Sequence, residues 1–145
     1  MPRFTRMLAA NAAAIALALS ATPLLAANTI NVTATGEGGG SMALTLDKTR
    51  VAAGPVTLVV HNDAMSEEHE VILVKLQSSD QKIPLIASKH RVDETDLESL
   101  GEVEDLKPGA DGKLDADLKA GTYLLFCNLK GHYEAGMAAK LTVTP

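Results

Sequence analysis

Apolar and polar residues alternate, or short β-branched runs occur, along most of the chain from residue 28 onward. This two-residue period is typical of β-strands with one buried face. Gly- and Pro-containing segments such as 36–40 and 52–55 separate the runs and predict turns. The expected strands are 28–35, 42–46, 56–60, 70–76, 113–118, 122–126 and 137–143. Many short strands between turns predict an all-β fold, a Greek-key β-sandwich.

The stretch 79–107 does not follow this pattern. Val92, Asp93, Leu97, Leu100 and Val103 partly fit a helical period, and Asp93 or Thr95 could cap the first turn. We therefore expect a short helical insertion around residues 92–106 that packs over the sandwich. Seven acidic residues and no basic residue lie between positions 93 and 105. This acidic run could steer a basic partner, but we favour the simpler interpretation of a solvated surface.

The first 27 residues differ in composition from the rest of the chain. Arg3 and Arg6 precede an Ala/Leu-rich apolar run, and small residues end it at Ala26 and Ala27. This pattern predicts a cleaved signal peptide at 1–27, a mature domain at 28–145 and a periplasmic location. A retained membrane anchor is the alternative, but the run is short and Ala-rich for a stable span. We expect no membrane span in the mature form.

The mature chain is predicted to be acidic and to have one unpaired cysteine. Without residues 1–27 it keeps 11 of the 13 basic side chains against 18 acidic ones, a formal net charge of −7. This charge disfavours binding to nucleic acid. Cys127 is the only cysteine, so an internal disulfide is excluded. Exported proteins normally pair their cysteines, and a lone thiol is therefore expected to be buried or bound to a metal.

Three possible metal ligands follow one another near the end of the chain. Cys127, His132 and Met137 are spaced five residues apart, with Gly131 and Gly136 beside them. Thiolate, imidazole and thioether are donors that suit copper, and two His, one Cys and a weak axial Met form the ligand set of blue-copper sites. A structural role for the cysteine and a core role for the methionine are the alternatives.

The fourth ligand must lie elsewhere in the sequence. His69, which stands where a polar loop enters a buried strand, is a candidate. His61 is a competitor, but it belongs to the alternation of the strand before that loop.

The sequence Asp117–Leu–Lys–Ala–Gly–Thr–Tyr–Leu–Leu–Phe–Cys127 and the spacing Cys-x4-His-x4-Met that follows resemble the cupredoxins, the small type 1 copper proteins related to azurin, plastocyanin and rusticyanin. The segment 54–62 and the run that begins at His69 resemble the strand, loop and strand that bring the first His ligand. The resemblance covers most of the mature chain and is weakest between 79 and 107. One departure is Glu70, because azurin and plastocyanin usually have Asn after the first His. Asn62 is a candidate for the brace that this Asn provides.

The resemblance implies a single type 1 copper held by His69, Cys127, His132 and Met137, with a weak contact from the Glu68 carbonyl. It also implies a tyrosine corner at Tyr123. The expected function is periplasmic electron transfer between Cu(I) and Cu(II), and the alternative is a copper carrier or storage protein. We expect no enzymatic activity, because the His-x-His motifs of multicopper enzymes are missing.

The resemblance also implies how partners bind. The edge of His132 is the expected electron port, where redox partner proteins dock. An apolar rim of Leu129, Tyr133 and Ala135 is expected around it. We expect a monomer.

Overall fold

The computed structural model describes residues 28–145, which fold into strands joined by turns and loops. The strands are β1 (Asn28–Thr35), β2 (Ala43–Leu46), β3 (Arg50–Ala52), β4 (Gly54–Asn62), β5 (His69–Lys75), β6 (Leu85–Ile86), β7 (Arg91–Val92), β8 (Glu98–Leu106), β9 (Asp111–Leu118), β10 (Gly121–Phe126) and β11 (Ala138–Thr144). The predicted signal peptide at 1–27 lies outside the described residues. Within residues 28–145, no helix is long and apolar enough to cross a bilayer.

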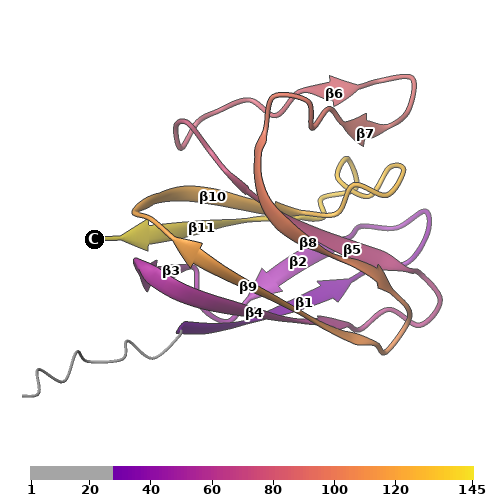
Figure 1. Ribbon diagram of the computed structural model, residues 1–145. Coiled ribbons are helices and arrows are strands. Elements are labelled where there is room, and N and C mark those ends of the chain that lie inside the picture. The colour runs from indigo at the N-terminus through magenta and orange to yellow at the C-terminus, as the bar shows by residue number, and fades with distance from the viewer. Residues whose placement is uncertain (1–27) are drawn as a thin grey trace, which may run out of the picture.

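Two sheets pack face to face in a β-sandwich (Figure 1). One sheet has the strand order β2-β1-β4-β9 and the other the order β3-β11-β10-β5-β8. β1 pairs with β4 and β3 pairs with β11 in parallel, whereas the other pairs are antiparallel. The prediction of an all-β sandwich is confirmed.

The main core lies between the sheets and consists mostly of Val, Leu and Ile. β5 is buried on both faces: Val71 and Leu73 point into this core, whereas Ile72 and Val74 belong to a second cluster. The second cluster lies on the outer face of the five-stranded sheet, where Val92 covers it. The β6–β7 hairpin is therefore packed over the sandwich, beside the loop that joins β10 to β11 (Figure 1).

The prediction of a helical insertion around residues 92–106 is wrong, because most of this segment forms β8. Two extra residues in β8 shift its register against β5, one between the pairs His69–Leu106 and Val71–Val103, the other near Gly101. Each β-bulge adds one residue to the strand, so the inward-facing apolar residues fall three apart instead of two. Gly101 has a φ of +129°, a value that helices do not use.

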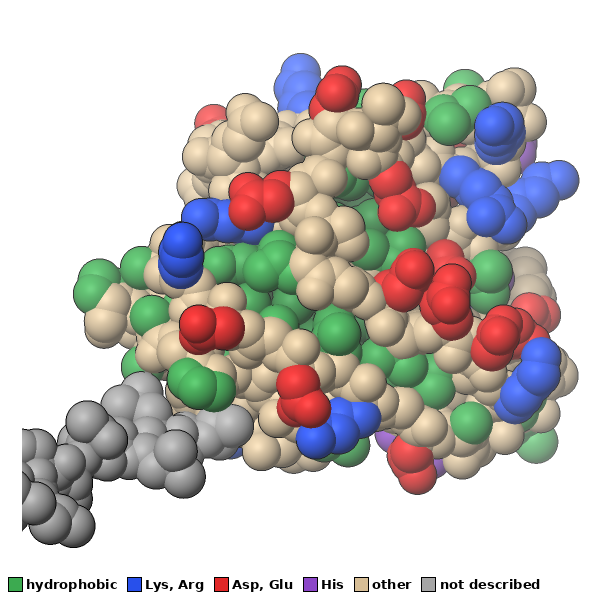
Figure 2. Space-filling model, in the orientation of Figure 1, with side chains coloured by type: hydrophobic (Ala, Val, Ile, Leu, Met, Phe, Trp, Pro, Cys, Tyr) green, Lys and Arg blue, Asp and Glu red, His purple; other side chains and the backbone are tan. Residues whose placement is uncertain are grey.

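The acidic run lies at an exposed edge. β8 is the last strand of its sheet, and Glu98, Glu102, Glu104 and Asp105 on it are exposed. Figure 2 shows Asp and Glu side chains gathered on the face that carries β8. Charged side chains on an edge strand oppose pairing with another chain, and this role explains the four acidic residues on β8.

Candidate metal centre

The loop between β10 and β11 is compact and held by its own backbone. Cys127 donates its N–H to the Met137 carbonyl (3.2 Å), and Met137 donates its N–H to the His132 carbonyl (3.1 Å). Gly136, at a φ of +105°, lies so close to the Met42 carbonyl that a Cβ would be 2.9 Å from that oxygen. The glycine is therefore required for the sharp return of the loop to β11.

The pairing of β5 with β10 brings the first histidine to this loop. Ile72 lies opposite Phe126, and His69 begins β5 near the point where Cys127 leaves β10. As a result, His69 lies beside His132 although 63 positions separate them in the sequence.

Three donor atoms converge at this point. The Nδ1 atoms of His69 and His132 are 3.2 Å apart, and the Cys127 Sγ lies 3.4 Å from the His132 Nδ1. His69 and Cys127 are completely buried, and His132 is 9% exposed. All three ligand atoms lie within 4.8 Å of one another, close enough to bind one metal ion. The prediction that these residues come together is confirmed, and their role as ligands stays a prediction.

Burial controls the charge of all three groups. Burial lowers the pKa of His69. It outweighs the opposite effect of the Gly36 carbonyl, which stabilises the protonated ring. Burial and then the neighbouring His69 lower the pKa of His132. Both rings are therefore neutral and able to coordinate at neutral pH. Burial raises the pKa of the Cys127 thiol to about 11, so a metal ion must displace its proton to bind the thiolate.

The donor set fits copper. One sulfur and two imidazole nitrogens combine soft and borderline donors in a buried site, a set that suits copper. The Nε2 atom of His69 is buried without a hydrogen-bond partner among the described residues. Coordination through Nδ1 would place the proton on Nε2.

Met137 stays a predicted axial ligand. Its side chain is completely buried, and its backbone is hydrogen bonded to both Cys127 and His132. The weak contact from the Glu68 carbonyl also stays a prediction. His61 lies on the other sheet, where its Nδ1 is 2.8 Å from an Asp111 carboxylate oxygen, so it is not part of the centre.

Glu70, the residue after His69, forms the hydrogen bond that braces the cysteine loop. The Glu70 carboxylate accepts the N–H of Asn128 (3.0 Å), the residue next to Cys127. Asn62 bonds elsewhere, because its amide donates to the carbonyls of Glu67 and Leu106 (2.9 and 2.8 Å). The expectation that Asn62 braces the cysteine loop is therefore wrong. The structure adds Glu70 and Asn128 to the site. Their contact could be predicted only from the pairing of β5 with β10, which the sequence does not reveal.

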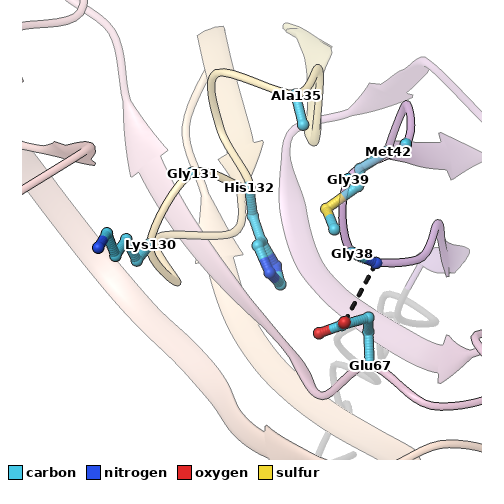
Figure 3. A pocket seen from close by; sticks show the side chains of 9 residues that line it. Gly38, Gly39, Met42, Glu67, Lys130, Gly131, His132 and Ala135 are labelled. Atoms are coloured by element: carbon cyan, nitrogen blue, oxygen red, sulfur yellow. Dashed lines mark hydrogen bonds between the residues drawn. The ribbon is translucent and has the colours of Figure 1, made fainter.

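The outer edge of His132 opens onto a surface pocket of about 500 Å³ (Figure 3). Its lining residues are Gly38, Gly39, Gly40, Met42, Glu67, Lys130, Gly131, His132 and Ala135. Only Ala135 of the predicted apolar rim lines it. Tyr133 instead packs edge-on against Phe126, with ring centroids 5.9 Å apart. Tyr123 donates its hydroxyl hydrogen to the Lys119 carbonyl (2.8 Å), which confirms the tyrosine corner.

The sandwich and the buried Cys–His–His set define a cupredoxin, a class of small proteins that bind one type 1 copper ion. The model of the sulfocyanin (SoxE) domain matches residues 5–145, and the chain therefore belongs to the sulfocyanin family.

Several solved cupredoxin structures share the fold. Dithionite-reduced auracyanin from Roseiflexus castenholzii is 22% identical over 83% of this chain and 99% of that one, with a TM-score of 0.57. Auracyanin B is 25% identical over 82% and 90%, with a TM-score of 0.56. Rusticyanin from Thiobacillus ferrooxidans is 15% identical over 80% and 76%, with a TM-score of 0.58. No curated protein sequence matches the chain.

Proposed function

We propose that the protein is a periplasmic electron carrier with one type 1 copper held by His69, Cys127, His132 and Met137. The convergence of the two Nδ1 atoms and the Cys127 Sγ within 4.8 Å is the observation that carries this proposal. When bound, the copper supplies a one-electron couple between Cu(I) and Cu(II). The protein supplies the two neutral imidazoles, the thiolate and a buried site.

The surrounding structure is suited to electron transfer. The donors come from a hydrogen-bonded loop and a strand buried on both faces, so they are expected to move little when the charge changes. Small rearrangement favours fast exchange of an electron. The only one of the three with solvent contact is His132, and its edge faces the pocket of Figure 3. We therefore propose that redox partner proteins dock around this pocket.

Reversible colour and electron exchange test this function. The copper-loaded protein should be blue, lose its colour with a mild reductant and regain it with an oxidant over many cycles. His61→Ala, which removes an exposed histidine outside the centre, is the matched control and should behave like the wild type. His69→Ala should lose the reversible colour. Equal behaviour of the two variants would contradict the proposed site.

A copper carrier or storage protein is the second candidate. One observation favours it: the thioether of Met42 lies in the pocket beside His132, where it could receive a soft copper ion (Figure 3). The two functions differ in which exchange is faster. Isotopically labelled copper that exchanges between molecules faster than electrons do would favour the carrier.

Export and assembly state belong to the same proposal. The residues 1–27 would direct export and be removed, which leaves the domain 28–145 as a monomer without enzymatic activity. Cell fractionation, the intact mass of the exported protein and its sedimentation test these points. A cytoplasmic protein of full mass would contradict the predicted processing.

A further inference from the structure

The β6–β7 hairpin contacts the ligand loop as well as the sheet beneath it. Gly131 donates its N–H to the His90 carbonyl (2.8 Å), and the His90 Nδ1 lies 2.9 Å from a Glu134 carboxylate oxygen. Behind these contacts, Val92 packs into the apolar cluster on the outer face of the five-stranded sheet. The hairpin thus packs against the loop that carries Cys127 and His132.

The side chain of Asn128 forms several hydrogen bonds between this hairpin and the ligand loop. Its side-chain oxygen accepts the Val92 N–H (2.6 Å), and its amide nitrogen donates to the Val92 carbonyl (3.1 Å) and to a Glu94 carboxylate oxygen (2.5 Å). The side chain is only 5% exposed. An amide is the group that can pair with both the N–H and the carbonyl of one strand residue, because it has donors and an acceptor.

The backbone of the same residue is held from the opposite direction. Its N–H donates to Glu70, which directly follows His69 on β5. Cys127 itself donates to the Met137 carbonyl. Asn128 therefore links β5, β7 and the ligand loop at the position next to the sulfur donor.

We propose that Asn128 is a positioning residue for the metal centre. It fixes the position of the Cys127 sulfur by hydrogen-bonding the ligand loop to β7. This inference rests on the proposed electron-transfer function. Its physical basis is that a loop held on both sides cannot relax when the charge at the centre changes. The hairpin thus limits rearrangement of the ligands during electron exchange.

Asn128→Ala removes the side-chain hydrogen bonds to Val92 and Glu94 and keeps every predicted ligand. We expect the copper-loaded variant to stay blue, with a changed copper hyperfine splitting and an electron self-exchange rate at least fivefold slower. In the metal-free protein, hydrogen exchange of the Val92 amide should become at least tenfold faster. Asn31→Ala is the matched control, since it removes an exposed Asn–Asp47 hydrogen bond on the other sheet (2.7 Å) and should change none of these values.

Asn128→Asp provides a second variant if the alanine variant does not fold. Its carboxylate cannot donate to the Val92 carbonyl or to Glu94, and it repels both of these oxygen acceptors. We expect the Val92 amide to be less protected and self-exchange to be slower than in the wild type. A folded variant of either kind with wild-type self-exchange and a wild-type spectrum would overturn the inference. If the wild type itself is not blue, the proposed function fails and this inference fails with it.

Discussion

Asn62 is predicted to stabilise the loop that leads to His69. It is completely buried, its amide nitrogen donates to the Glu67 and Leu106 carbonyls, and its side-chain oxygen accepts the Ala64 N–H (2.9 Å). Asn62→Ala removes all three bonds. At about 1 kcal/mol for each net hydrogen bond, the variant should lose about 3 kcal/mol of unfolding free energy.

Urea denaturation of the metal-free protein measures this loss as a lower midpoint at an unchanged slope. Asn31→Ala is the control, because its side-chain bond to Asp47 is exposed and should contribute less than about 1 kcal/mol. Copper affinity should also fall in Asn62→Ala, since the loop before His69 loosens. A loss in Asn62→Ala no greater than that in Asn31→Ala would refute the reasoning.

Three further predictions concern pH, the tyrosine corner and the ligand loop. Burial lowers the pKa of His69 and His132 in the folded metal-free protein, so the unfolded chain gains protons first as the pH falls through 6.5. The stability of the folded metal-free protein should therefore fall as the pH drops below about 6.5. Denaturation curves at several pH values check this, and an equal dependence of stability on pH in a His69→Ala/His132→Ala variant would contradict it. Tyr123→Phe removes one hydrogen bond and should lower the unfolding free energy by about 1 kcal/mol without changing the copper spectrum; a changed spectrum would place the residue's effect at the centre. Gly136→Ala places a Cβ 2.9 Å from the Met42 carbonyl oxygen at a positive φ, so it should lower the unfolding free energy by about 2 kcal/mol. The variant should also retain less copper during dialysis. Wild-type stability together with wild-type copper retention would contradict the predicted strain.

The two-residue hydrophobic period predicted most of the long strands, because strands such as β1 and β9 alternate without interruption. It failed at β8, where two bulges produce a three-residue spacing that imitates a helix. β3, β6 and β7 have two or three residues each, too few for any period.

The site was predicted in part for a similar physical reason. Cys127, His132 and Met137 occupy one loop, so their spacing alone brings them close together. His69 comes from a distant strand, and its assignment depended on the family resemblance. The contact of Glu70 with Asn128 depends on the same pairing of β5 with β10, and no local pattern reveals it.

Visible absorption and electron paramagnetic resonance of the copper-loaded protein test the central claim most directly. A type 1 site predicts an intense blue absorption and a narrow copper hyperfine splitting, both lost in Cys127→Ser. A colourless copper protein, or a blue one whose colour survives Cys127→Ser, would contradict coordination by this thiolate.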